Sequence, residues 1–203
     1  MSITGKRYLD YASFIKSRFG ERVQKISLNT AFSCPNRDGT KGFGGCTYCN
    51  NNTFNPDYCI STKTVTEQLE EGIRRFSKKY KTQQYLAYFQ AYTNTYSDIA
   101  SLKKLYEEAL SVSGVIGLVI GTRPDCISEE IIEYLSFLSQ HHYISLEFGV
   151  ESTLNSTLKT VNRCHTFEDT KAAYNKCQNK GIHLGAHLIL GLPGESKEDL
   201  LNH

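Results

Sequence analysis

The sequence predicts an α/β fold in which a parallel sheet is covered by helices. Five short apolar runs, rich in β-branched and aromatic residues, recur along the 203 residues. Amphipathic segments with a helical period lie between these runs, and strands that alternate with helices favour a parallel sheet over a helical bundle or a β-sandwich. We therefore expect successive βα units that form a barrel or part of one.

The expected elements follow one another in order along the chain. A helix at about residues 10–18 comes first and ends at Gly20, where a left-handed cap meets no Cβ clash. The later helices show apolar residues at helical spacing, and the last complete one is closed by Gly181. The predicted strands are residues 23–28, 84–90, 115–120, 144–150 and 183–190, and the predicted helices between them are residues 65–80, 98–111, 128–140 and 166–180.

The chain is expected to stop before such a fold can close. A turn is predicted after the fifth strand, at Gly191-Leu-Pro-Gly-Glu195, and Ser196 with Asp199 predicts the start of another helix, since a serine oxygen accepts an orphan backbone N–H. A parallel barrel needs further strands to close. We therefore expect residues 1–203 to form one core domain of five βα units, truncated at its C-terminal end within or before the sixth unit.

The bulk composition is that of an ordinary globular domain. Hydrophobic residues make up 39% of the chain and charged residues 22%. No apolar run approaches the roughly 18 residues of a membrane helix, and no secretory signal opens the chain, so we expect a cytosolic protein that does not bind membranes and keeps its seven cysteines reduced. The net charge of +2 neither requires nor excludes a nucleic-acid partner.

Three cysteines lie close together in a polar connection after the first predicted strand. Cys34, Cys46 and Cys49 have the spacing C-x11-C-x2-C, and glycine and asparagine are frequent around them. Such residues tolerate unusual backbone angles and could wrap backbone N–H groups around sulfide. The connection covers about residues 30–63, and loops of this length are usually functional. Three thiolates on a four-iron cluster would leave one iron open to a small molecule.

The spacing by itself leaves other thiol chemistry open. A structural zinc site could add Cys59 as a fourth ligand, because one C-x2-C pair is common to zinc and iron–sulfur sites. Disulfides would need an oxidising compartment, and three unliganded thiols fit poorly in so polar a loop. The remaining cysteines, Cys126, Cys164 and Cys177, are expected to pack as small apolar residues.

Further short motifs occur in a distinctive order. They are Arg18-Phe-Gly-Glu-Arg-Val-Gln-Lys-Ile26, Cys34-Pro-Asn-Arg-Asp-Gly-Thr40, Gly45-Cys-Thr-Tyr-Cys-Asn-Asn51, Gly121-Thr-Arg-Pro-Asp125, Glu147-Phe-Gly-Val-Glu-Ser152 and His187-Leu-Ile-Leu-Gly-Leu-Pro-Gly-Glu195. Together they resemble the radical S-adenosylmethionine (SAM) superfamily and, within it, the YhcC/YtqA-type proteins, which are related to the elongator catalytic subunit and the oxygen-independent coproporphyrinogen oxidases. The first cysteine gap is longer than in the superfamily's commonest C-x3-C-x2-C pattern, but this subfamily also has a long gap.

The resemblance implies a partial (β/α)6 barrel of the TIM type and a defined cofactor chemistry. Cys34, Cys46 and Cys49 would hold a 4Fe–4S cluster whose fourth iron chelates the amino and carboxylate groups of S-adenosylmethionine. The reduced cluster would donate one electron to the sulfonium, and the resulting 5′-deoxyadenosyl radical would abstract hydrogen from a substrate. The protein would supply orientation and exclude water.

The resemblance also implies which residues touch the cofactor near the cysteines. Tyr48 would lie near the adenine, with ordinary loop packing as its alternative. The backbone carbonyls of Ala91, Tyr92 and Thr93 would meet the methionine amino group. Relatives have glycines and an acidic residue in this segment, so only a role of the backbone can be inferred for this sequence.

The later motifs supply the other implied contacts. Glu151 would hydrogen-bond the cofactor, and Arg163 would bind the methionine carboxylate, with a surface salt bridge as its alternative. Ile189 would press on the adenine or belong to the core.

The sequence leaves open the roles of two pairs of charged or polar residues. Arg123 and Asp125 could line the substrate side or pair with each other. Glu147 and His187 are expected to face the same interior, where either could meet cofactor or substrate.

The resemblance makes tRNA the first expected substrate, because relatives in the elongator branch act on the wobble uridine and the YtqA-type group is associated with 5-substituted uridines. A one-electron donor of the flavodoxin or ferredoxin type would also be needed. The alternatives are a radical enzyme for a small molecule and a non-catalytic, zinc-binding interaction module. Basic residues that could contact phosphates, or serve solubility alone, are Lys6, Arg7, Arg18, Arg22, Lys25, Arg74, Arg75, Lys78, Lys79, Lys81, Lys103 and Lys104.

Overall fold

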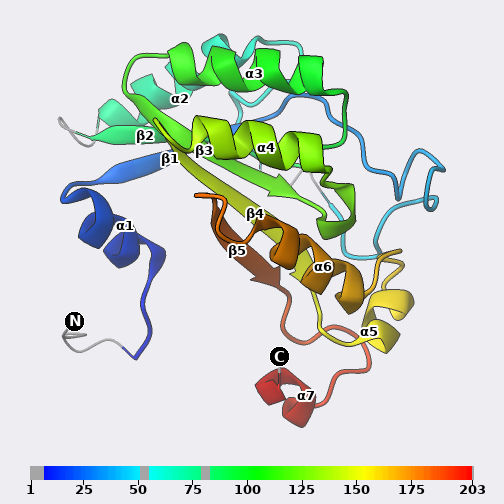
Figure 1. The fold of residues 1–203 in the computed structure, drawn as a ribbon. Helices are drawn as coiled ribbons and strands as arrows, with labels where there is room; N and C mark the ends of the chain where they lie inside the picture. The colour runs from blue at the N-terminus through cyan, green and yellow to red at the C-terminus, as the bar shows by residue number, and fades with distance from the viewer. Residues whose placement is uncertain (1–6, 51–54, 79–82, 203) are drawn as a thin grey trace.

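The computed structural model describes residues 7–50, 55–78 and 83–202 and shows one parallel sheet with helices on its outer face (Figure 1). Neighbouring strands pair in sequence order and are all parallel. The predicted α/β fold is confirmed. The strands are β1 (Val23–Leu28), β2 (Gln84–Phe89), β3 (Val115–Thr122), β4 (Tyr143–Glu151) and β5 (His183–Leu188).

Seven α-helices are present in the described part of the chain. They are α1 (Tyr11–Phe19), α2 (Val65–Ser77), α3 (Ile99–Ser111), α4 (Glu129–Leu138), α5 (Asn155–Thr160), α6 (Phe167–Cys177) and α7 (Lys197–Asn202). Polar side chains cap the starts of α1, α2, α3, α4 and α6, and each accepts a backbone N–H of the first turn. The predicted ranges of several helices start one residue too early, because they include the capping residue, which lies outside the helix. The predicted cap of α7 is also confirmed, since Ser196 Oγ accepts the Asp199 N–H at 3.2 Å.

The structure also contains elements that the sequence did not predict. These are the short helix α5 and a 3-10 turn at Pro124–Cys126. Strands β3 and β4 run further than predicted, and β5 ends at Leu188, so that Ile189 follows the strand. The predicted end of α2 at Tyr80 lies outside the described residues, as do Lys6, Asn51, Lys79 and Lys81.

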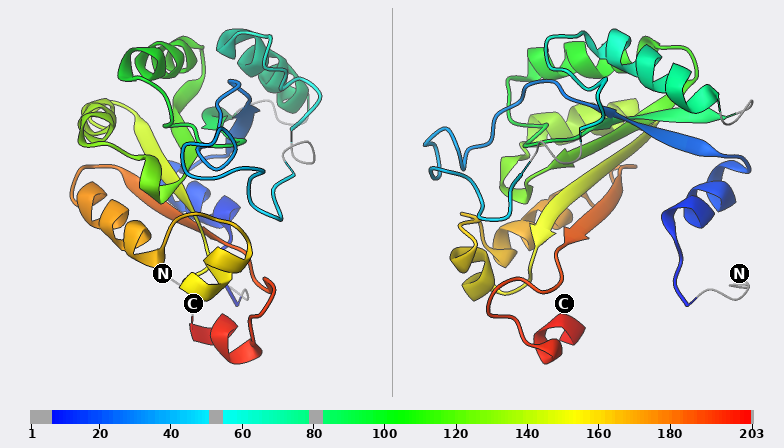
Figure 2. Two further views of the ribbon diagram at one scale, coloured as in Figure 1. Left: turned by 90° about the vertical axis from the view of Figure 1, so that its right-hand side faces the viewer. Right: turned by 180° about the vertical axis from the view of Figure 1, so that it is seen from behind.

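The two faces of the sheet differ in chemistry because successive side chains of a strand point to opposite sides. Apolar residues such as Ile26, Phe89 and Leu146 are fully buried in the main core beneath the outer helices. On the inner face, a smaller apolar cluster packs against Ile15 of α1. Figure 2 shows α1 on the opposite side of the sheet from α2 and α3, near the start of β1. Helix α1 thus closes the amino end of the inner face.

No helix in the described part of the chain is long and apolar enough to cross a membrane.

Close packing of α2 on β1 requires a glycine. Gly72 is buried in the middle of α2, and a Cβ at this position would overlap Cγ2 of Ile26 and lie 3.1 Å from the Tyr58 ring. The helix can approach the strand this closely only because residue 72 has no side chain.

We predict that Gly72→Ala lowers the free energy of unfolding by about 1–2 kcal/mol, because the overlap with Ile26 outweighs the better helix propensity of alanine. Denaturant unfolding measures this change. Ser77→Ala, at the exposed end of the same helix, is the matched control and should alter stability by less than about 0.5 kcal/mol. Wild-type stability of the Gly72 variant would show that the helix lies further from the sheet.

Candidate functional site

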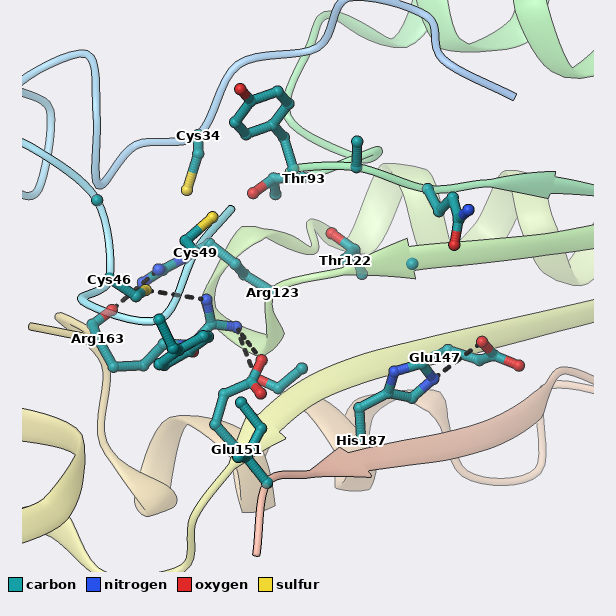
Figure 3. Close-up of a pocket in the computed structure, with 18 of the residues that line it drawn as sticks. Cys34, Cys46, Cys49, Thr93, Thr122, Arg123, Glu147, Glu151, Arg163 and His187 are labelled. Carbon is teal, nitrogen blue, oxygen red and sulfur yellow. Dashed lines mark hydrogen bonds and ion pairs between the residues drawn. The ribbon is translucent and has the colours of Figure 1, made fainter. Parts of the chain in front are cut away.

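A cavity of about 520 Å³ opens at the carboxyl ends of the strands. Its walls come from the segment with the three cysteines, which we call the cysteine loop (residues 34–49), from Arg163 between α5 and α6, and from residues within or just after β2, β3, β4 and β5. Parallel strands end at one edge of the sheet, so segments far apart in the sequence meet there. Figure 3 shows side chains of these segments around the same space.

All ten predicted site residues line this cavity. They are Cys34, Cys46, Tyr48, Cys49, Ala91, Tyr92, Thr93, Glu151, Arg163 and Ile189. The lining also includes Arg123, Glu147 and His187, whose roles the sequence left open.

The cysteine loop is held against the connection between α5 and α6. The backbone N–H of Thr47 donates to Val161 O at 3.1 Å, and the Asn162 side chain donates to Gly45 O at 2.9 Å. In return, Asn36 Nδ2 donates to the Asn162 carbonyl. Helix α5, which the sequence did not predict, therefore positions the loop.

The sulfur of Cys46 lies among hydrogen-bond donors. Cys46 is buried, and its Sγ is 3.5 Å from Asn36 Nδ2 and 3.7 Å from Arg163 Nη1. Cys34 is also buried, whereas Cys49 is half-buried and its carbonyl accepts a hydrogen bond from Arg37 Nη2 at 3.2 Å. Figure 3 shows the three sulfurs on the same side of the cavity.

Arg163 forms a buried ion pair rather than a surface salt bridge. Its Nη2 donates to Gly149 O at 2.6 Å and lies 3.4 Å from Oε1 of Glu151. Glu151 has a left-handed backbone conformation, with a φ of +68°. Burial raises the pKa of Glu151, and the nearby Arg163 opposes this rise. The surface alternative for Arg163 is therefore wrong.

The segment after β2 has a strained backbone. Ala91 and Tyr92 are consecutive left-handed residues, with φ values of +71° and +63°. Non-glycine residues in this region cost about 1–3 kcal/mol each and cluster at functional sites. The Ala91 carbonyl accepts from Asn94 Nδ2 at 3.1 Å, which leaves a second lone pair. Tyr92 is 41% exposed, and the Arg37 guanidinium lies 5.5 Å from the centre of its ring.

The motif after β3 forms a buried charge pair. Arg123 Nε and Nη2 donate to the two carboxylate oxygens of Asp125, each at 2.9 Å, and Arg123 Nη1 donates to Arg163 O at 2.9 Å. Lys41 of the cysteine loop adds a contact to Asp125 at 2.6 Å. Burial alone would raise the pKa of Asp125, but Arg123 and Lys41 lower it to about 2. Arg123 therefore pairs with Asp125, and it also lines the cavity.

Glu147 and His187 face the same cavity and contact each other, as expected. His187 Nε2 lies 3.0 Å from Glu147 Oε2, and Lys25 Nζ bonds the other carboxylate oxygen. Lys25 lies between the rings of Tyr11 and Tyr88, 4.3 and 4.5 Å from their centres. Burial alone would raise the pKa of Glu147, but His187 and Lys25 lower it to about 2. The hydrogen bond with Glu147 in turn raises the pKa of His187.

The other cysteines lie apart from the three in the loop. Cys59 is buried in the main core, its thiol donates to Ser27 O at 2.9 Å, and burial raises its pKa to about 12. Cys177 packs in the same core as predicted and Cys126 is half-buried. Cys164 is exposed in a left-handed turn with a φ of +58°, so the packing prediction is wrong for it.

Within the described residues, no three or more His, Cys, Asp or Glu side chains converge as they would around one metal ion. Cys59 in particular lies in the main core, where its thiol donates to Ser27 O, and not with the three cysteines of the loop.

Three residues that hold this site together, Lys25, Asn36 and Lys41, were not predicted to belong to it. Each acts through a partner distant in the chain, respectively Glu147, Asn162 and Asp125. Lys25 and Asn36 each occur in one of the motifs that carry the family resemblance, whereas Lys41 occurs in none of them.

Comparison with known proteins identifies relatives over most of the chain. The family model described as Radical SAM superfamily matches residues 33–203. YhcC of Escherichia coli K12 is 37% identical over 185 residues, which cover 91% of this chain and 59% of that protein. YtqA of Bacillus subtilis is 34% identical over 200 residues, covering 98% and 62%. The chain thus spans about three fifths of the length of these curated relatives.

Two enzymes named for tRNA match parts of the chain. The tRNA uridine(34) acetyltransferase of Methanocaldococcus infernus is 37% identical over 83 residues, covering 41% of this chain and 15% of that protein. The tRNA-2-methylthio-N(6)-dimethylallyladenosine synthase of Thermotoga petrophila is 29% identical over 156 residues, covering 71% and 35%.

Among solved structures, Elp3 of Methanocaldococcus infernus has a TM-score of 0.60 at 20% identity, covering 87% of this chain and 40% of that chain. At such an identity the likeness shows the fold alone.

We predict that acid destabilises the protein through Asp125 and Glu147. Their pKa values of about 2 in the folded protein lie below the ordinary 3.8 and 4.5, so the unfolded chain binds more protons as the pH falls from about 5 to 2. The free energy of unfolding should drop across this range, by about 2 kcal/mol for Asp125 and about 3 kcal/mol for Glu147. Denaturant unfolding at a series of pH values measures the slope. Glu147→Gln should flatten it, and an unchanged slope would contradict the assignment.

Proposed function

Because the chain belongs to the radical SAM superfamily, we propose that its cavity binds a 4Fe–4S cluster and S-adenosylmethionine and that the protein is a radical enzyme. The main support is that Cys34, Cys46 and Cys49 line one cavity together with the buried pair of Arg163 and Glu151. Since the chain spans about three fifths of its curated relatives, the activity of the whole protein belongs to this proposal.

The side chains around the cavity fit such a polar ligand. The Tyr48 hydroxyl, Thr93 Oγ1 and Arg163 Nε are buried and make no hydrogen bond. An unpaired buried polar group costs about 1–3 kcal/mol, so a ligand that bonds these atoms would be favoured. The thiols also fit, because each thiolate of a 4Fe–4S cluster binds a different iron and need not converge on one ion.

Each residue then has a proposed role. The three cysteines hold the cluster, and Arg163 binds the methionine carboxylate, for which its free Nε is available. Glu151 accepts hydrogen bonds from the cofactor. The backbone of Ala91, Tyr92 and Thr93 binds the amino group, and Tyr48 and Ile189 contact the adenine.

When bound, the cluster and S-adenosylmethionine supply one-electron cleavage of the sulfonium C–S bond and the 5′-deoxyadenosyl radical. The protein's own contribution is orientation and the exclusion of water. The electron would come from a donor of the flavodoxin or ferredoxin type, in the reducing cytosol.

The proposed substrate is tRNA, at its wobble uridine. Support comes from the two relatives named for tRNA, although they match only part of the chain. A basic group on α2 offers phosphate contacts, since Arg74 and Arg75 are 66% and 59% exposed and each is at least 3.9 Å from its nearest carboxylate. A small-molecule substrate remains the alternative.

We predict that Cys46→Ala abolishes cluster assembly and leaves the fold intact. After anaerobic reconstitution, iron and sulfide should fall from about four of each per chain to near zero. The metal-free variant should keep wild-type thermal stability, because Cys46 belongs to neither hydrophobic cluster. Loss of folding would instead indicate a structural metal.

Cys59→Ala is the matched control for this experiment. It should cost about 1 kcal/mol of stability, because Cys59 packs in the core, and it should retain the cluster. A wild-type protein that keeps one zinc per chain, and loses it in the Cys59 variant, would contradict the radical enzyme.

We predict that the full-length protein binds tRNA in a gel-shift assay at low salt, with an affinity that falls as salt is raised. Arg74→Ala with Arg75→Ala should weaken binding and lower the salt slope by about one for each phosphate contact removed. Lys171→Ala with Lys176→Ala, on the distant helix α6, should change neither. Absence of binding at low salt would favour a small-molecule substrate.

A further inference from the structure

Cys46 receives two N–H groups at its sulfur. One comes from the neutral amide of Asn36 at 3.5 Å and the other from the guanidinium of Arg163 at 3.7 Å. Both groups are in a buried environment, where electrostatic interactions are stronger than in water. Both donor nitrogens therefore lie within hydrogen-bond distance of the sulfur that would bind iron.

Asn36 differs from Arg163 because it does not belong to the cavity lining. It is fully buried behind Cys46, so it can reach a bound cofactor only through that sulfur. Its effect on the site can therefore be separated from direct binding of S-adenosylmethionine.

The orientation of Asn36 is determined by its neighbours. Its Nδ2 also donates to the Asn162 carbonyl, which can only accept, so the nitrogen and not the oxygen lies on this side. On the other side, a Cβ on Gly42 would overlap Asn36 Oδ1, which shows how closely the loop backbone approaches the amide. The amide therefore keeps its N–H directed at Cys46.

We propose that Asn36 is a positioning residue that raises the reduction potential of a cluster bound through Cys46. This inference rests on the proposed function. Reduction adds one electron, taken from the external donor, and no bond forms or breaks. The added negative charge spreads onto the thiolate sulfurs, so an N–H group that donates to Cys46 stabilises the reduced state more than the oxidised state. Hydrogen bonds to the sulfurs are among the factors that set iron–sulfur potentials.

The test compares Asn36→Leu with wild type in the full-length protein. Leucine has a similar shape but no N–H. After anaerobic reconstitution to equal iron and sulfide content, an EPR-monitored redox titration should give a midpoint potential more negative than that of wild type. A wild-type potential in this variant would overturn the proposal.

Asn162→Gly is the matched control. Asn162 has a φ of +55°, which glycine adopts without strain, and its side chain bonds the carbonyls of Phe43 and Gly45. This variant loses loop contacts but retains both N–H donors, so its thermal stability should fall while its potential stays at the wild-type value. A shift equal to that of Asn36→Leu would show that loop attachment, not the N–H donor, sets the potential, and would also overturn the proposal.

If Asn36→Leu assembles no cluster, Asn36→Ala replaces it, since alanine also lacks the N–H and should likewise give a midpoint potential more negative than that of wild type. A further measurement on wild type tests whether the thiolate sulfurs accept hydrogen bonds. Wild-type protein reconstituted in D₂O should show a deuterium shift of its iron–thiolate stretching bands in resonance Raman spectra, because the donors to sulfur carry deuterium. No shift would overturn the proposal. A wild-type protein that binds no 4Fe–4S cluster would overturn the proposed function as well, whereas a cluster without these effects would overturn this inference alone.

Discussion

The site depends on how the cysteine loop is held against the connection between α5 and α6. Asn36 donates to the Asn162 carbonyl across this contact, and the Asn162 side chain donates to the Gly45 carbonyl of the loop, although Asn36 and Asn162 are 126 residues apart in the chain. The same connection supplies Arg163, whose guanidinium reaches Cys46 and whose carbonyl accepts from Arg123. One contact therefore fixes the position of the cysteines, Arg163 and the buried charge pair after β3 relative to one another.

Charge balance is the second constraint on this arrangement. Arg123 is almost fully buried, which is tolerable only because the two oxygens of Asp125 pair with it in a planar geometry. Arg163 is balanced in part by Glu151. In the middle of β4, the two carboxylate oxygens of Glu147 pair with Lys25 and His187. Paired charges thus line the inner side near the cavity, whereas the apolar cluster against α1 lies at the amino end of the same face.

Much of the fold could be predicted because its determinants are local. The alternation of apolar runs with amphipathic segments indicated the parallel sheet, and single polar residues such as Ser128 and Thr166 marked helix starts. Helix α5 could not be predicted, because six residues are too few to show an apolar period. The role of Asn36 was hidden for a different reason. An asparagine in a glycine-rich loop has the composition of a turn, and its partner lies 126 residues away.

The two left-handed residues after β2 show how this site is related to the stability of the protein. Ala91 and Tyr92 adopt a conformation that glycine would adopt at lower energy. A chain selected for stability alone would have little reason to keep side chains at these positions. The backbone after β2 therefore costs folding free energy, and in return it holds the aromatic ring of Tyr92 against the Arg37 guanidinium. Other parts of the domain must offset this loss of folding free energy, and the closely packed core beneath the outer helices can do so.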